Sequence, residues 1–340
     1  MKKTLLIIFL ALTMVFSLVA CDNDASNESE SLIFNSRGDG TCTVKGKPDS
    51  TETSVVVPAT SPAGDTVVSV NLEGCVNVEQ VTLPEGLERI DYDAFNGCKK
   101  LKSVNIPSSV KILHNNAFKD CVALASITIP TSVTRVEDGV FQGCTSLTAV
   151  TLPDTVTSLG NWVFSGCTAL TSVTFPAGTK QLMAGFFKGC TALSALTLPD
   201  SITAIGAEAF AGCTNLSALT LPDGLLDIGG GVFAGCTALE VLDLPESVRS
   251  LEDKTFKDCT ALTEMTLPAA MEYLGEGVFE GCTALAEVHF DETEGWESLA
   301  ADSAEYKPVA AETLEDPAAN ATALKGELVA VKFYRMPAEP

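Results

Sequence analysis

The stretch FSGCTALTSVTFP (residues 164–176) is followed 23 positions later by FKGCTALSALTLP (187–199) and again by FAGCTNLSALTLP (210–222). Apolar residues that return at the same places with a fixed period of this length are typical of a stack of equal structural units. One such unit cannot bury its own apolar side chains, so its neighbours must cover them. The stretch therefore predicts a solenoid.

Three residue types mark the same period along most of the chain. Phenylalanine precedes cysteine by three residues in nine units, with Leu72 in that place in the first, and proline ends nine units. Because these marks coincide repeatedly, residues 67–290 are predicted to form ten coils of 23 residues. The cysteines that define the coils are Cys75, Cys98, Cys121, Cys144, Cys167, Cys190, Cys213, Cys236, Cys259 and Cys282.

Each coil is predicted to begin with a short strand. The segment SVTFP alternates in polarity, which is the period of a strand, and its proline cannot donate to a ladder and so ends the strand. A bend, a second extended piece such as VTSLG (156–160) and one helical or 3₁₀ turn then complete the coil. Equivalent side chains should stack in columns, with the phenylalanines forming the main internal spine.

The cysteines have three interpretations. Export would favour disulfides, and evenly spaced thiols could hold a metal. However, every coil carries the same motif with no sign of pairing by twos, and neither histidine nor a C-x-x-C spacing accompanies it. Buried free thiols that act as small apolar side chains are the favoured prediction, and no metal or other cofactor is expected.

The first residues have the pattern of a lipoprotein signal. A basic start and an apolar run lead to LVAC, in which Cys21 follows small residues, and a polar stretch begins at once. We expect residues 1–20 to be a cleaved signal peptide and Cys21 to be the lipidated residue. Residues 21–30 would then be a flexible tether, and the protein would be an extracytoplasmic lipoprotein held at the membrane.

Composition argues against two classes of function. The formal net charge of -23 disfavours nucleic acid as a partner, because few cations are present to neutralise phosphates. Only two histidines are present, His114 and His289, and they lie in different coils without a patterned nucleophile. No catalytic residue is predicted, and we expect a protein without enzymatic activity.

The outward positions of the first strand supply the candidate binding residues. They are hydroxyl-rich in the middle and acidic towards the end, while the early end carries lysines. The column could serve only to keep the sheet solvated, could bind a protein or glycan, or could order ice, although Asn105 and Asp243 interrupt it. The candidates are Thr128, Thr151, Thr174, Thr197, Thr220, Glu240, Asp243, Glu264 and Glu287.

The unit F-x-G-C-T-x-L-x-x-V-x-L-P-x-x-V-x-x-I resembles the BspA-like leucine-rich repeat, the LRR_5 type, over residues 67–290. This resemblance implies an α/β repeat solenoid, a right-handed coil with a parallel β-sheet and short helical or 3₁₀ turns. It also implies small caps, here residues 31–66 and 291–340, with Trp296 in the second. The resemblance further implies a bacterial surface protein that adheres to host extracellular matrix, host cells or other bacteria. A surface spacer without a dedicated ligand is the alternative.

Overall fold

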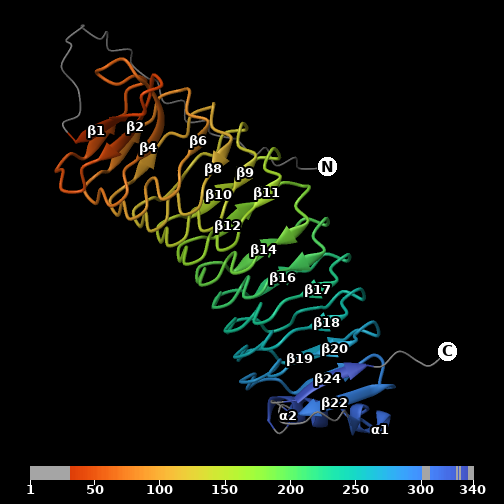
Figure 1. Ribbon diagram of the computed structural model, residues 1–340. Coiled ribbons are helices and arrows are strands. Elements are labelled where there is room, and N and C mark those ends of the chain that lie inside the picture. The colour runs from red at the N-terminus through yellow and green to blue at the C-terminus, as the bar shows by residue number, and fades with distance from the viewer. Residues whose placement is uncertain (1–30, 301–306, 327, 329–330, 336–340) are drawn as a thin grey trace, which may run out of the picture.

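The protein is an elongated solenoid in which the chain winds steadily from one end to the other (Figure 1). The computed structural model describes residues 31–300, 307–326, 328 and 331–335. Nearly all of its regular structure is short strands, and the two helices lie together at the C-terminal end. The predicted stack of coils is confirmed.

A small sheet begins the described chain. Strand β1 (Leu32–Ser36) pairs antiparallel with β2 (Thr41–Gly46), which pairs parallel with β4 (Thr66–Asn71). This sheet presents Cys42, Val44 and Val70 to the interior, where it joins the same apolar core as the repeats. The first coil is therefore covered rather than left open to solvent.

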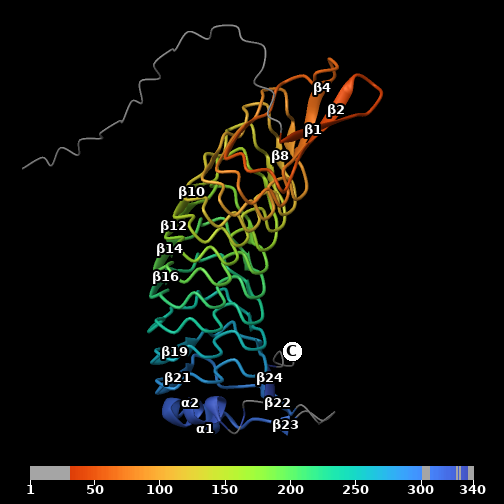
Figure 2. The same cartoon turned by 90° about the vertical axis from the view of Figure 1, so that its left-hand side faces the viewer.

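The first strand of each coil forms a series of short parallel ladders. Pairing joins β3–β5–β7, β10–β12, β14–β16 and β19–β21, so the expected main sheet is divided into separate pieces. Figure 2 shows those from β10 to β21 along one side of the solenoid. They are β3 (Ser54–Val56), β5 (Gln80–Thr82), β7 (Ser103–Val104), β10 (Ala149–Thr151), β12 (Ser172–Thr174), β14 (Ala195–Thr197), β16 (Ala218–Thr220), β19 (Glu264–Leu267) and β21 (Glu287–Phe290).

The second extended piece of each coil, after the proline, forms the more continuous ladder. It comprises a four-stranded sheet, β6–β8–β9–β11, and a longer sheet that starts at β13 and runs into the C-terminal cap. The strands are β6 (Arg89–Ile90), β8 (Ile112–Leu113), β9 (Arg135–Val136), β11 (Ser158–Leu159), β13 (Gln181–Leu182), β15 (Ala204–Ile205), β17 (Asp227–Ile228), β18 (Ser250–Leu251) and β20 (Tyr273–Leu274).

The phenylalanines three residues before the cysteines form one internal file. Every ring from Phe95 to Phe279 is fully buried, and successive rings are nearly parallel with centroids 5.1–5.8 Å apart. The predicted spine is confirmed. Truncating one such ring removes a large buried apolar surface and costs about 3–5 kcal/mol.

A succession of hydrogen-bonded turns returns each coil to its start, without a helix in the described repeats. In one such turn the amide of Cys190 donates to the carbonyl of Phe187 at 2.9 Å, and the amide of Phe187 donates to Ala209 of the next coil at 2.7 Å. Gly189 adopts φ +75°, a left-handed conformation that glycine tolerates best. Coils are thus joined on this side as well.

The ladder cysteines are buried, as predicted, and all eleven cysteines in the described residues are free. From Cys98 onwards, each thiol donates a hydrogen bond to a backbone carbonyl 26 residues earlier. That carbonyl belongs to Leu72 for Cys98 and to a phenylalanine of the spine for the others, as for Cys190, which donates to Phe164 at 3.1 Å. Burial raises the pKa of Cys213 to about 12. The thiols therefore act as protonated donors within the core.

The C-terminal segment covers the last coil. Strand β24 (Val331–Arg335) pairs antiparallel with β20 and with β22 (Trp296–Ala300), which also pairs with β23 (Lys307–Pro308). Helices α1 (Ala311–Leu314) and α2 (Pro317–Lys325) follow, and the side chain of Asn320 donates to the carbonyl of Val288 in β21. Trp296 is buried beside Phe290.

Candidate binding face

The five candidate threonines are all exposed, and four of them lie on the outer side of the first-strand ladders. Alternation along each strand turns Val150 into the core and leaves Thr151 exposed, as the period of two requires. Thr151 stands beside Thr174, and Thr197 stands beside Thr220, in parallel register. Because β12 and β14 are not paired, these four threonines form two adjacent pairs rather than one unbroken row, and Thr128 lies outside the strands.

The acidic candidates lie further along the same side, and all four are exposed. Glu264 and Glu287 are direct neighbours in the parallel pair β19–β21. Like charges placed side by side on a sheet destabilise it, so a cation held between them would relieve that repulsion. Within the described residues Glu264 has no ion pair, whereas Glu287 lies 3.0 Å from His289.

Shallow hollows accompany the threonines. One, of about 590 Å³, lies beside Thr128 and Thr151, and another, of about 630 Å³, lies between Thr174 and Thr197. The second opens where β12 and β14 are unpaired. The face is therefore uneven, and the linings of both hollows combine threonine hydroxyl groups with apolar side chains.

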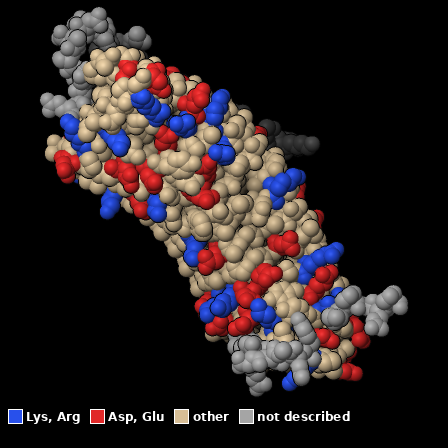
Figure 3. Space-filling view, viewed as in Figure 1, with Lys and Arg blue, Asp and Glu red and all other residues tan. Residues whose placement is uncertain are grey.

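The lysines at the early end of the face are partly neutralised. Lys102 lies 2.7 Å from Glu79, and this hydrogen bond and charge lower the pKa of that carboxyl, while Lys100 donates to Asn77. Figure 3 shows the opposite, second-strand side of the molecule, where charged side chains gather towards both ends and are sparse over the middle.

A polar cluster on the second-strand side was not found from the sequence. The exposed ring of Tyr92 stacks on His114 with centroids 4.3 Å apart, and Nδ1 of His114 lies 2.8 Å from Glu137, which also pairs with Arg135. The signal in the sequence is the position 16 residues after each ladder cysteine. In three successive coils it holds Asp91, His114 and Glu137, which stack in one column. The cluster holds these coils together.

The lipidation prediction at Cys21 lies outside the described residues, as does the whole of 1–30. Among the residues that are described, none belongs to a helix with the length and apolar character that a bilayer crossing requires. Nor do those residues contain a cluster of three or more His, Cys, Asp or Glu side chains arranged to hold a metal ion.

Comparison with known families gives one match. The sequence model described as "BspA type Leucine rich repeat region" matches residues 67–194 and 180–296, with six copies. These ranges span more than half of the chain and contain all of the candidate binding residues. No curated protein matches the chain.

Solved structures share the architecture. A leucine-rich repeat protein from Bacteroides ovatus is 27% identical, with 77% of this chain and 70% of that chain covered and a TM-score of 0.72. A leucine rich cell surface protein from Faecalibacterium prausnitzii is 23% identical, covers 80% and 96%, and has a TM-score of 0.50. The pneumococcal vaccine antigen PcpA is 18% identical, covers 78% and 80%, and has a TM-score of 0.55.

Proposed function

Because this chain belongs to the BspA-type leucine-rich repeat family, we propose that it is a lipid-anchored bacterial surface protein that binds macromolecules through the outer face of its first-strand ladders. The binding requires no catalysis. Adhesion to a protein or glycan of host matrix or of other cells is the role that this face supports best. The relatives with solved structures include a cell surface protein and a vaccine antigen, which favours a surface location.

The adjacency of Glu264 and Glu287 carries the proposal. Two exposed carboxylates in register, close to Glu240 and Asp243, form a negative end beside a neutral hydroxyl-rich middle. The basic side chains of a partner would neutralise the carboxylates of the negative end, and its polar groups would hydrogen-bond to the threonine hydroxyls of the middle. Weak contacts of this kind gain strength when many anchored copies act together on one surface.

The test uses a soluble form with residues 31–340 against immobilised matrix proteins, glycans and whole cells. We expect capture by at least one basic partner, and at least a tenfold loss of affinity in the double variant Glu264→Lys/Glu287→Lys. The control, Glu88→Lys/Asp227→Lys, makes the same charge change at exposed positions on the second-strand side. Capture of nothing would favour a surface spacer without a ligand, and equal affinity of both variants would reject the acidic end.

Anchoring is tested separately. In a bacterial host fed an alkyne-tagged fatty acid, the chain should incorporate the tag and partition with membranes. The variant Cys21→Ala should lose the label, because it lacks the thiol that is acylated. A label that survives this substitution would reject Cys21 as the lipidation site.

A further inference from the structure

The ladder of second strands is interrupted at one place. Between neighbouring coils, two backbone hydrogen bonds recur, and the pair from Thr203 to Lys180 and from Gly206 to Leu182 is one example, at 2.9 and 2.7 Å. The equivalent pair is present at seven of the eight junctions within residues 88–275. At the remaining junction of this described range both bonds are missing. The amide of Lys180 does not donate to the carbonyl of Thr157, and the amide of Met183 does not donate to that of Leu159.

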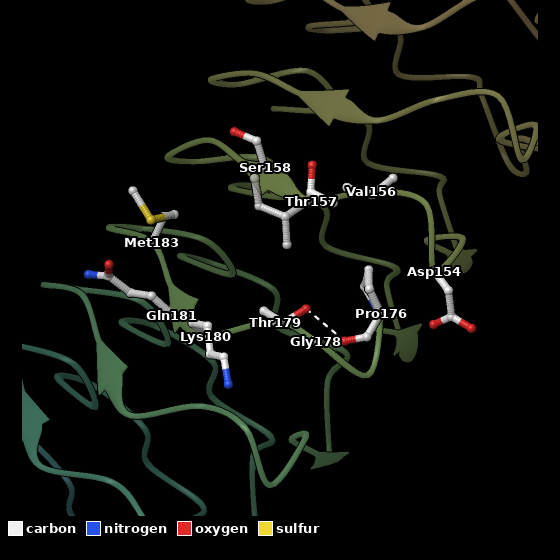
Figure 4. A pocket seen from close by; sticks show the side chains of 11 residues that line it. Asp154, Val156, Thr157, Ser158, Pro176, Gly178, Thr179, Lys180, Gln181 and Met183 are labelled. Atoms are coloured by element: carbon white, nitrogen blue, oxygen red, sulfur yellow. Dashed lines mark hydrogen bonds between the residues drawn. The ribbon is translucent and has the colours of Figure 1, made fainter.

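A cavity of about 400 Å³ opens at this junction. Figure 4 shows Thr157 and Ser158 on one wall and Lys180 and Gln181 on the other, with Met183 at the side. Its volume falls within the usual range for small-ligand sites, about 300–1,000 Å³. The missing bonds leave two carbonyl acceptors on one wall and two amide donors on the other.

Two unusual side chains in one coil account for the opening. Thr179 takes a slot that is apolar in the neighbouring coils, as at Val156 and Ile202, and its hydroxyl donates to the carbonyl of Pro176. Phe186 takes a slot that holds alanine, valine or threonine in the other coils from residue 94 onwards, and its ring lies 5.0 Å from that of Phe187. Extra volume in a packed core forces its neighbours apart.

The coil that carries these side chains, residues 167–189, is offset from its neighbours. Its first strand, β12, pairs with the preceding coil but not with the following one, whereas its second strand, β13, does the reverse. The coil therefore leans, and the cavity is the space left on the second-strand side.

Both ends of the cavity are closed. The amide of Ala177 donates to the side chain of Asp154 at 3.2 Å, and the amide of Ala184 donates to that of Asn161 at 3.2 Å. An extended polypeptide could not pass through between these bonds. The occupant must instead be compact and must enter from the surface.

We propose that this cavity binds a neutral saccharide of one or two units. Sugar hydroxyls both donate and accept, so they can satisfy the carbonyls of Thr157 and Leu159 and the amides of Lys180 and Met183 at once. The apolar faces of a sugar ring match the side chains of Val156, Leu159 and Met183 in the lining. One lysine and one aspartate leave the lining without net charge, which favours a neutral ligand over an ionic one.

This inference goes beyond the proposed function, because the cavity lies on the second-strand side and does not depend on the threonines or on Glu264. If the cavity binds no saccharide, the proposal for the first-strand face is unaffected, and a failure of that face leaves the cavity proposal unaffected. The two are distinguished by whether a ligand shifts the amide resonances of Lys180 and Met183 or those of the first strands.

The first measurement is amide hydrogen exchange in the free protein. Lys180 and Met183 should exchange at least 100-fold faster than Thr203 and Gly206, their counterparts in the next coil, because only the latter pair is hydrogen-bonded. Equal protection of the two pairs would mean that the ladder is closed in solution, and the proposal would fall.

The second measurement is titration of the isotopically labelled protein with maltose, lactose, sucrose and N,N′-diacetylchitobiose, one at a time. At least one should shift the Lys180 and Met183 amide resonances in a saturable way, without moving those of Thr203 and Gly206. The variant Thr179→Val/Phe186→Val, which restores the side chains of neighbouring coils, should slow exchange at both amides and weaken binding at least tenfold.

Three results would overturn the proposal. They are no shift with any of the four disaccharides, a shift that persists unchanged in a variant whose amides have become protected, and preferential binding of the control peptide acetyl-DTVTSLG-amide at the same amides. The peptide has the sequence of residues 154–160, which contain the carbonyls of Thr157 and Leu159 that these amides face.

Discussion

Single side chains decide how closely neighbouring turns approach. Trp162 adopts φ +52° and is 43% exposed, and its indole lies against Gly185 of the next coil. Gly185 itself is at φ +59°, and a Cβ there would overlap the Trp162 ring. A glycine is therefore needed at this position for both its backbone conformation and the space that it leaves.

Substitution of Gly185 by alanine should be costly. The left-handed backbone and the overlap with the indole should together lower the free energy of unfolding by about 2–4 kcal/mol, measured by urea denaturation. The control is Gly178→Ala, where nothing lies within 4 Å and φ is not left-handed. Its effect should be within about 0.5 kcal/mol. Equal effects of the two substitutions would contradict this account.

At the scale of elements, β24 is the strand that joins the cap to the repeats. It continues the second-strand ladder beyond β20, and the side chain of its own residue Phe333 is buried in the core. Lys332 pairs with Asp253 of an earlier coil at 3.0 Å, and this hydrogen bond raises the pKa of the ammonium group. Terminal units of a repeat array need such a cover, because one of their faces has no neighbouring repeat.

Removal of this cover should loosen one end of the molecule only. The variant Phe333→Asp places a charge in the buried site and should detach β24. Hydrogen exchange should then rise at least tenfold in β18 and β20 and stay unchanged in β6 and β8, since coils interact mainly with their neighbours. Thr313→Asp, at an exposed position of α1, is the matched control. A uniform rise along the chain would contradict a local capping role.

Across the whole molecule, the thiol column couples folding to pH. Burial raises the pKa of Cys98, Cys167 and Cys213 to about 12, against an ordinary value of 9.0. The folded state thus keeps protons that the unfolded state releases. Their stabilising effect is complete below pH 9 and is lost progressively as the pH rises from about 9 to about 12.

We therefore expect stability to fall steeply with alkalinity. Each of these thiols should lower the free energy of unfolding by up to about 1.4 kcal/mol per pH unit above 9. Urea denaturation at pH 8, 9 and 10 measures the slope, and thiolate absorbance at each pH shows when the sulfurs ionise. In concentrated guanidinium the same thiols should titrate near their ordinary value. A stability that is flat between pH 8 and 10 would contradict the burial of protonated thiols.

Much of the fold and part of the candidate face were predictable from the sequence. The period, the phenylalanine spine, the burial of the cysteines and the exposure of Thr151 and Glu264 all follow from side chains that return to the same environment in every coil. The stacking of Tyr92 on His114 was not predictable in the same way, because it depends on residues that occur in single coils.

The amino-acid sequence by itself determined that equivalent residues stack, and therefore which side chains are inside and which are outside. Only the tertiary structure decided which ladder stays continuous and where it opens. The physical reason is that the spacing of two coils depends on the summed volume and polarity of several slots at once. Thr179 and Phe186 each look like minor variations of the repeat, but together they tilt one coil and separate Lys180 from Thr157.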